Sequence, residues 1–204
     1  MPLRRARALP FLLLAVAGGV GGGATADAHP HVFVDYAVLV RFGAGGVESV
    51  EITWTFDEFT SALILRQFDK DRDGKLSPDE VRQVERGHFA ETRESQYFLS
   101  LRLNGAALPI ASARDFSARV VNGRVSYVFT VPMATPAIAG GAAGRLELMA
   151  DDPTIYTAFD LSPQAPVRVA APQGLTAECQ VIRDPKGAVM DFIRCNYDYH
   201  RGSR

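Results

Sequence analysis

The order of apolar and polar side chains predicts two strands around a glycine-rich turn early in the chain. Residues 31–42 are rich in Val, Phe and Tyr, and residues 47–56 alternate Ile52, Trp54 and Phe56 with polar neighbours. A period of two is the signature of a strand, because successive side chains point to opposite faces. Glycine-rich residues 43–46 supply the turn between them.

Further strands are predicted along the second half of the chain. Apolar residues alternate or cluster over 97–103, 116–121, 124–131, 146–149, 155–161 and 178–182. Asn122-Gly123 separates the second and third of these runs and is the preferred two-residue hairpin turn. Many short strands with Gly and Pro between them favour a mainly β fold, an antiparallel β-sandwich-like domain.

One segment, at about residues 57–95, has helical spacing instead. Its apolar positions are Phe59, Leu63, Ile64 and Phe68 before a polar loop, and Val81, Val84 and His88 or Phe89 after it. A period near 3.6 predicts a helix on each side of the loop. We therefore expect a helix-loop-helix insertion within one β-rich domain spanning residues 29–204.

The first 28 residues have the layout of a cleavable secretory signal. Three arginines precede an apolar stretch from Leu9 to about Val20, and the small residues Ala26 and Ala28 fit a signal-peptidase site. An uncleaved anchor is the alternative, although the apolar stretch is short for a bilayer. Cleavage after Ala28 removes 28 of the 204 residues and leaves 176.

Charge and cysteine content change the picture once the leader is removed. The net charge of −1 becomes −3, because Arg4, Arg5, Arg7 and Asp27 leave together. Such a chain offers no broad cationic face, so nucleic acid is excluded as a partner class. In an oxidising compartment we expect Cys179 and Cys195 to form a disulfide. Thiolate metal ligation is the alternative, but the spacing is not CxxC-like.

The polar loop of the insertion matches the EF-hand calcium loop. Residues 69–80 read DKDRDGKLSPDE. The predicted calcium ligands are the carboxylates of Asp69, Asp71, Asp73 and Glu80 and the backbone carbonyl of Lys75. Gly74 occupies the position of the sharp turn, and Ser77 begins an Ser-x-x-Glu capping box for the exit helix.

We expect this loop to bind calcium weakly and to serve as a structural site. Lys70, Arg72 and Lys75 offset the ligand carboxylates, and the chain contains no second loop to pair with the first. The expected dissociation constant is about 10⁻⁴ to 10⁻³ M, as in extracellular modules. The alternative is an acidic turn that binds no metal.

Cleavage after Ala28 would create a second candidate metal site at the new terminus. The free amine and imidazole of His29, with His31 nearby, provide nitrogen ligands that suit Zn²⁺, Ni²⁺, Co²⁺ or Cu²⁺. Pro30 has no amide proton, which excludes the amino-terminal Cu/Ni site of square-planar geometry, because that site needs deprotonated backbone amides. The remaining arrangement of ligands is closer to a histidine brace. Asp152 is a candidate further ligand. The alternative is that both histidines are simply exposed and that Asp152-Pro153 forms a turn.

Several segments together resemble a bacterial exported family, the domain of unknown function 1007. They are His29–Asp35 (HPHVFVD), Thr53–Phe59 (TWTFDEF), the calcium-type loop and Asp151–Phe159 (DDPTIYTAF). Members of that family look like periplasmic components of uncharacterised ABC-type transport systems, and many accompany nickel/cobalt-type transporters. The resemblance implies a periplasmic location, an inner-membrane metal transporter as partner and a role in divalent-metal handling.

These observations lead to a calcium-binding EF-hand protein of the periplasm that acts as an accessory or binding component in nickel, cobalt or zinc-type transport. A non-catalytic structural partner of a membrane permease is the first alternative. A copper-dependent histidine-brace enzyme is the second. We expect no enzyme, because GxSxG, HExxH, CxxC and phosphate-binding glycine motifs are all missing from the sequence.

Overall fold

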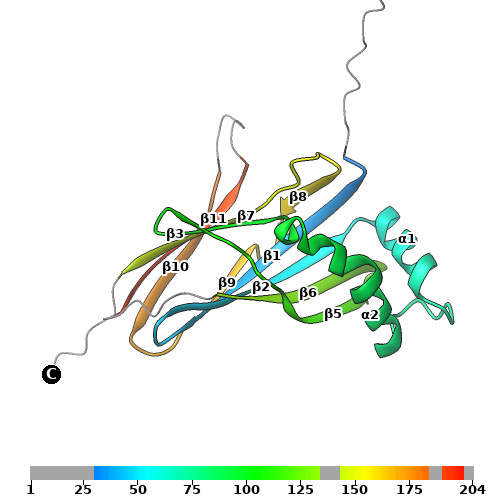
Figure 1. Ribbon diagram of the computed structural model, residues 1–204, viewed down its shortest axis with the longest axis horizontal. Helices are drawn as coiled ribbons and strands as arrows, with labels where there is room; N and C mark the ends of the chain where they lie inside the picture. Colours follow the sequence, from blue (N-terminus) through cyan, green and yellow to red (C-terminus); the bar gives the residue numbers. More distant parts are fainter. Residues whose placement is uncertain (1–29, 134–142, 184–189, 200–204) are drawn as a thin grey trace, which may run out of the picture.

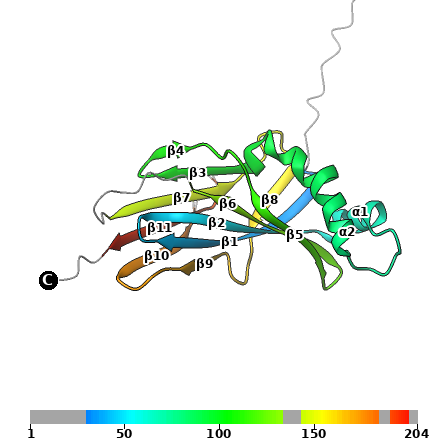
Figure 2. The same ribbon diagram turned by 60° about the horizontal axis from the view of Figure 1, so that its bottom comes forward.

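Two β-sheets packed face to face form the body of the molecule, which is described by a computed structural model. The structure describes residues 30–133, 143–183 and 190–199. The predicted signal peptide at residues 1–28 and the predicted ligand His29 therefore lie outside the described residues. Figures 1 and 2 show the sheets as two layers, with the helices gathered at one end. No helix in the described segments is both long and apolar enough to cross a membrane.

The first sheet has the order β5-β6-β2-β1-β8, and β9 also pairs with β1. Its strands are β1 (Val32–Gly43), β2 (Gly46–Phe56), β5 (Arg114–Val121), β6 (Arg124–Pro132), β8 (Thr157–Leu161) and β9 (Val167–Ala170). The pairs β1/β2, β2/β6 and β5/β6 are antiparallel. Strands β8 and β9 instead run parallel to β1, one after the other along its length.

The second sheet has the order β10-β11-β7-β3-β4 and is antiparallel in every pair. Its strands are β3 (Leu99–Leu103), β4 (Ala106–Leu108), β7 (Gly144–Ala150), β10 (Leu175–Ile182) and β11 (Phe192–Tyr199). The predicted disulfide is present between β10 and β11, where Cys179 and Cys195 face each other with Cα atoms 4.0 Å apart.

The inward faces of the two sheets share one core. Alternate residues of β1 and β2, including Val38, Val40, Ile52 and Trp54, are almost fully buried. They pack in the same cluster as Leu146 and the other inward residues of the second sheet. This alternation is the pattern that the sequence predicted, and it confirms the mainly β, sandwich-like fold.

The helical insertion lies against the β5/β6 end of the first sheet (Figure 2). It contains α1 (Glu58–Phe68), α2 (Pro78–Val84), a π-helical turn (Glu85–Phe89) that continues α2, and two short 3₁₀ turns (Ala90–Arg93 and Gln96–Phe98). Helix α1 buries Ile64 and Phe68 but leaves Phe59 70% exposed and Leu63 40% exposed. Of the four apolar positions predicted to face the core, two are therefore buried and two are exposed to solvent.

Candidate metal centre

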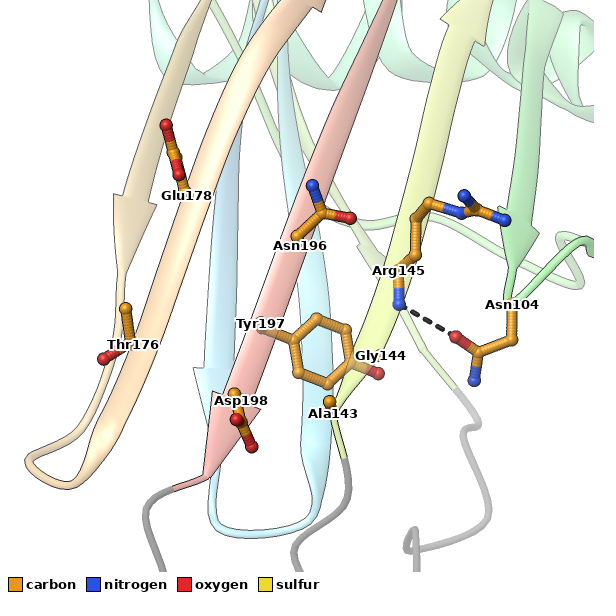
Figure 3. A pocket seen from close by; sticks show the side chains of 9 residues that line it. All are labelled: Asn104, Ala143, Gly144, Arg145, Thr176, Glu178, Asn196, Tyr197 and Asp198. Carbon is orange, nitrogen blue, oxygen red and sulfur yellow. Dashed lines mark hydrogen bonds between the residues drawn. The ribbon is translucent and has the colours of Figure 1, made fainter.

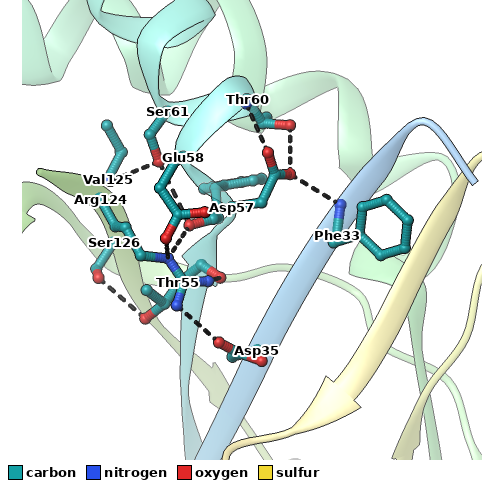
Figure 4. A network of polar contacts seen from close by, with 11 residues as sticks. Phe33, Asp35, Thr55, Asp57, Glu58, Thr60, Ser61, Arg124, Val125 and Ser126 are labelled. Carbon is teal, nitrogen blue, oxygen red and sulfur yellow. Dashed lines mark hydrogen bonds and ion pairs between the residues drawn. The ribbon is translucent and has the colours of Figure 1, made fainter.

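Asp57, the residue before α1, attaches the helix pair to the first sheet. Its Oδ1 accepts a hydrogen bond from Thr60 N at 2.9 Å, and its Oδ2 accepts from Thr60 Oγ1 at 2.6 Å and from Phe33 N of β1 at 3.1 Å. Figure 4 shows this carboxylate between helix and strand. Burial alone would raise the pKa of Asp57, but the hydrogen bonds from Thr60 and Phe33 hold it below its ordinary value.

Arg124, at the start of β6, binds the first turn of α1 and the strands beneath it. Its Nη1 lies 2.9 Å from Asp35 Oδ2, and its Nε lies 4.0 Å from Glu58 Oε1. The same guanidinium donates to the carbonyl oxygens of Phe56 and Thr55 at 2.6 Å and 3.2 Å. One side chain thus links β1, the end of β2 and the helix (Figure 4).

Ser61 completes the attachment from the buried side of α1. The Ser61 side chain is fully buried, and its Oγ accepts a hydrogen bond from Val125 N at 2.8 Å. The same hydroxyl lies 3.4 Å from the Phe56 carbonyl oxygen, to which it donates. The end of β2, the start of β6 and α1 are therefore locked together next to the loop that α1 leads into.

That loop, residues 69–80, brings three carboxylates together. One oxygen from each of Asp69, Asp71 and Asp73 lies within 4.8 Å of the other two. Backbone amides hold the side chains in place: Asp73 N donates to Asp71 Oδ1 at 3.3 Å, and Lys75 N donates to Asp73 Oδ1 at 2.8 Å. Across the described parts of the chain, no other set of three His, Cys, Asp or Glu side chains converges in this way.

Asp69 differs from the other two aspartates because it is buried. Its side chain is only 9% exposed, while Asp71 and Asp73 are exposed. Its Oδ2 accepts from Gly74 N at 3.0 Å, but its buried Oδ1 has no hydrogen-bond partner among the described residues. A buried carboxylate oxygen without a partner carries a desolvation cost that a cation would remove.

The neighbouring carboxyl groups also influence one another. The hydrogen bond from Asp73 N would by itself lower the pKa of Asp71. Desolvation and the carboxyl groups of Asp73, Asp69 and Glu80 outweigh it and raise the pKa overall. The loop therefore concentrates negative charge that favours either a proton or a cation.

Glu80, the predicted last ligand, caps α2 instead of joining the aspartate cluster. It is 5% exposed, and its Oε2 accepts from Ser77 N and Ser77 Oγ, both at 2.8 Å. Its Oε1 accepts from Lys70 N at 2.6 Å. These hydrogen bonds hold the pKa of Glu80 below its ordinary value, the one from Lys70 most strongly. The capping box predicted from Ser77 and Glu80 is present.

The second predicted metal site has one residue outside the described part of the chain, His29, so it stays a prediction. His31 lies directly before β1, with its ring centroid 5.2 Å from that of Tyr156. Asp152 is buried, and both of its oxygens accept hydrogen bonds from its own turn: Oδ1 from Thr154 N and Oγ1, and Oδ2 from Thr157 N. Burial would raise its pKa, but these hydrogen bonds lower it. Asp152 thus already has a structural role in this turn.

A shallow hollow of about 540 Å³ lies on the outer face of the second sheet. Figure 3 shows its polar side chains spread along β10, β11 and β7 rather than aimed at one point. Arg145 N donates to Asn104 Oδ1 within it at 2.8 Å. Because these side chains differ in charge and do not converge, they form no binding site for one kind of ligand, and we assign this hollow no function.

Sequence reasoning identified the three loop aspartates but missed the residues that position them. Asp57 carries a local signal, since an aspartate directly before a helix is a preferred N-cap. The roles of Arg124 and Ser61 have no such signal, because their partners are far away in the sequence.

Fold and site together define a two-sheet β protein with a helix-loop-helix insertion whose loop gathers three aspartates. The family model described as "Protein of unknown function (DUF1007)" matches residues 13–187. The chain belongs to this family, which confirms the resemblance seen in the sequence. It is also similar to the "Uncharacterized 15.5 kDa protein in trpE 3'region" of Spirochaeta aurantia, with 28% identity over 111 residues, 54% of this chain and 77% of that protein.

Proposed function

We propose that the loop at residues 69–80 is a calcium site and that the protein is a calcium-binding protein. The observation that carries this proposal is the buried Asp69 Oδ1, which has no hydrogen-bond partner within the described part of the chain and belongs to the cluster formed with Asp71 and Asp73. Hard oxygen ligands of this kind suit Ca²⁺. The backbone carbonyl of Lys75 is the fourth ligand in the EF-hand pattern.

The role of Glu80 explains why we expect a weak site. To bind calcium with both oxygens, Glu80 must exchange its hydrogen bonds with Ser77 and Lys70 for the ion. Lys70, Arg72 and Lys75 also reduce the negative potential of the loop. We therefore expect a dissociation constant of about 10⁻⁴ to 10⁻³ M, and a structural role that holds α1 and α2 together.

Isothermal titration calorimetry of residues 29–204 with CaCl₂ tests this proposal. We expect one site in the wild type and none in Asp69→Asn, which keeps the shape of the side chain but loses its charge. Asp198→Asn is the matched control, because it removes the same charge from an exposed position on β11. A wild-type protein that binds no calcium at millimolar concentrations, or an Asp69→Asn variant that binds like the wild type, contradicts the proposal.

We further propose that the protein works outside the cytoplasm as an accessory component in nickel, cobalt or zinc-type transport. The transport role rests on the sequence resemblance described above, since the family model itself carries no function. The Cys179–Cys195 disulfide is compatible with export. Cell fractionation and N-terminal sequencing test the location, with a periplasmic product that begins at His29 expected. Uptake of labelled Ni²⁺, Co²⁺ and Zn²⁺ in a deletion strain tests the role, and unchanged uptake of all three metals contradicts it.

The N-terminal transition-metal site of His29 and His31 is a separate proposal with its own test. Protein beginning at His29 should bind Zn²⁺, Ni²⁺, Co²⁺ or Cu²⁺ more tightly than protein carrying one extra alanine, because the extra residue moves the chelating amine away from the His29 imidazole. Equal affinities of the two forms contradict a chelating terminus. Asp152→Asn tests the third ligand, and its effect on affinity is compared with its effect on folding.

A structural partner of a permease is the second candidate function, favoured by exposed apolar side chains around the start of β1. Phe33, Phe59, Ile155 and Tyr156 are all at least half exposed. Phe33 N donates a hydrogen bond to Asp57, which lies two residues before Phe59. His31 N donates to the carbonyl oxygen of Tyr156. These contacts place the four apolar side chains at the same end of the molecule. Site-specific crosslinking from position 59 in cells tests this candidate. The absence of any cross-link to a membrane protein contradicts it.

A further inference from the structure

A polar trough of about 330 Å³ lies on the outer face of the first sheet. Its strand residues come from β1, β2, β5 and β6 and alternate with buried residues such as Trp54 and Tyr127, so they point away from the core. The β5/β6 turn at Asn122 lines one side, and residues 162–164, which follow β8, line the other. The volume lies at the lower end of the range of ligand pockets, which suits a small molecule.

Four side chains of the trough form one row across four strands. Asp35 of β1 pairs with Thr55 of β2. Thr55 pairs in turn with Ser126 of β6, and Ser126 pairs with Arg119 of β5. Residues directly opposite each other in antiparallel strands have their side chains on the same face, and three strand spacings amount to about 14 Å. A ligand lying along this row therefore finds an acidic and a basic group at its two ends and hydroxyl groups between them.

The basic end of the row carries an unpaired charge. At the acidic end, the Asp35 carboxylate lies 2.9 Å from Arg124 Nη1, so these two charges compensate each other (Figure 4). The Arg119 side chain is exposed and makes no hydrogen bond or ion pair with another described residue. Asp35, Arg119 and Arg124 together give the lining a net charge of +1, although the whole chain carries −1. An unpaired guanidinium favours a carboxylate, which it binds through two parallel hydrogen bonds.

Hydroxyl and amide side chains make up most of the remaining lining. They belong to Thr53, Thr55, Asn122, Ser126, Ser162 and Gln164. The Thr53 hydroxyl makes no hydrogen bond to another described residue. Thr55 Oγ1 and Ser126 Oγ lie 3.0 Å apart, and when Ser126 donates, the Thr55 proton is free for an acceptor in the trough. Side chains that both donate and accept match the hydroxyl groups of a ligand in either direction.

We propose that this trough binds a small polyhydroxylated carboxylate, a sugar acid, and that Arg119 binds its carboxylate group. The hydroxyl and amide side chains of the floor and the two sides bind the hydroxyl groups of the ligand. A neutral sugar would leave the guanidinium without a charged partner. A sugar phosphate, with a charge of about −1.5 to −2, would exceed the single positive charge of the lining. A ligand with one carboxylate and several hydroxyl groups matches both features of the trough.

Titration with D-gluconate, followed in ¹⁵N–¹H correlation spectra of residues 29–204, tests this proposal. The side-chain amides of Asn122 and Gln164 report on opposite sides of the trough, in calcium-free buffer at pH 7 and constant ionic strength. We expect gluconate to move both signals with a dissociation constant on the order of 1 mM. D-glucitol, which carries CH₂OH in place of the carboxylate, should bind about tenfold more weakly. Hexanoate, which keeps the carboxylate without the hydroxyl groups, should bind at least about fivefold more weakly.

Substitutions on β5 identify the group that binds the carboxylate. Arg119→Gln removes the charge from an exposed side chain, so the preference for gluconate over glucitol should fall to about twofold or less. Its affinity for glucitol should stay close to that of the wild type. Arg119→Lys keeps the charge without the planar fork and should show an intermediate preference. Arg114→Gln is the matched control, because it removes the same charge from an exposed position of the same strand outside the trough.

Any of four results overturns the proposal. Gluconate gives no saturable shift of the two amide signals, gluconate and glucitol bind equally well, hexanoate binds as tightly as gluconate, or Arg119→Gln keeps the wild-type preference. The trough and the calcium-type loop share no residue, so the two proposals are tested separately.

Discussion

Asp57 shows how one residue can join two elements. Its carboxylate caps α1 through Thr60 and at the same time accepts a hydrogen bond from the Phe33 amide of β1. Because Asp69 is the C-cap residue that directly follows α1, the position of the first loop ligand depends on a residue one helix length away. Ser61 and Arg124 fix the same end of α1 from its other sides.

Asp57→Ala should therefore destabilise the protein by about 1 kcal/mol or slightly more at pH 7, the usual cost of a lost N-cap. The folded-state pKa of Asp57 is below its ordinary value of 3.8, so its contribution is complete above that value and is lost as the pH falls through the lower folded-state pKa. Urea unfolding at pH 7 and at about pH 3 measures the difference, which should shrink in acid. A difference that grows in acid contradicts the assignment. Asp198→Ala, exposed on β11, should change stability little at either pH.

Glu80 and Ser77 allow capping to be separated from metal binding. Glu80→Gln retains one oxygen acceptor for the capping box, but its NH₂ group replaces an oxygen that accepts from Lys70 N or from Ser77, so the metal-free protein should lose about 1 kcal/mol of stability. Its calcium affinity should fall at least tenfold, because the amide supplies one neutral oxygen instead of a carboxylate.

Ser77→Ala should lower the stability without lowering the calcium affinity. It removes a cap worth about 1 kcal/mol but leaves every predicted calcium ligand in place. Thermal unfolding without calcium and calorimetry with calcium measure the two effects on both variants. If both variants lose stability and affinity in the same proportion, Glu80 acts in this loop only as a cap.

Among the elements, those with local signals were predictable from the sequence and those that depend on distant partners were not. The hairpin of β5 and β6 follows from Asn122-Gly123, whose φ angles of 52° and 77° are those that the turn requires. Strands β4, β9 and β11 were not predicted. Strand β11 alternates Ile193, Cys195 and Tyr197 inward, but its pattern is short and its partner β7 lies more than forty residues earlier. The parallel pairing of β8 and β9 with β1 is likewise non-local.

Helix α1 shows the same limit within one element. Its apolar residues suggest that Phe59 and Leu63 face the core, yet the helix is rotated so that Thr60 and Ser61 are buried instead. The hydrogen bonds of these two side chains with Asp57 and Val125 fix that rotation.

Within the candidate site, the loop aspartates were predictable because the ligand pattern is contiguous in the sequence. The attachment of α1 through Arg124 and Ser61 was not, because the partners of these side chains lie far away in the sequence.

The disulfide joins the two strands at one side of the second sheet, and it closes a loop of 16 residues. Cys179→Ala with Cys195→Ala should lower the free energy of unfolding by about 3 kcal/mol. Urea unfolding of the double variant, compared with the wild type under oxidising conditions, measures this loss. Reduction of the wild type by dithiothreitol should reproduce it. A double variant as stable as the oxidised wild type would show that the antiparallel pairing of β10 and β11 is sufficient by itself.

At the scale of the whole molecule, the loop is attached to the common core through α1 and α2, so calcium should stabilise the entire domain. With a dissociation constant of about 0.3 mM, 10 mM CaCl₂ adds about 2 kcal/mol, which corresponds to an increase in Tm of about 4–8 °C for a domain of this size. Differential scanning calorimetry with and without calcium measures the shift. It should disappear in Asp69→Asn and remain in Asp198→Asn. A two-step transition in which only the first step responds to calcium would instead show that the helix pair unfolds separately.

The two short parallel strands at the edge of the first sheet also affect how the protein behaves at high concentration. Strand β8 covers Val32–Tyr36 of β1 and β9 covers Val38–Arg41, so the outermost row of backbone groups is divided between strands of five and four residues. Open strand edges promote pairing between molecules, and very short edge strands prevent it. Pro163 and Pro166 lie between these two short strands and interrupt the edge further. On this side we therefore expect the protein to resist edge-to-edge self-association, because neighbouring molecules have no continuous template on which to begin a shared sheet.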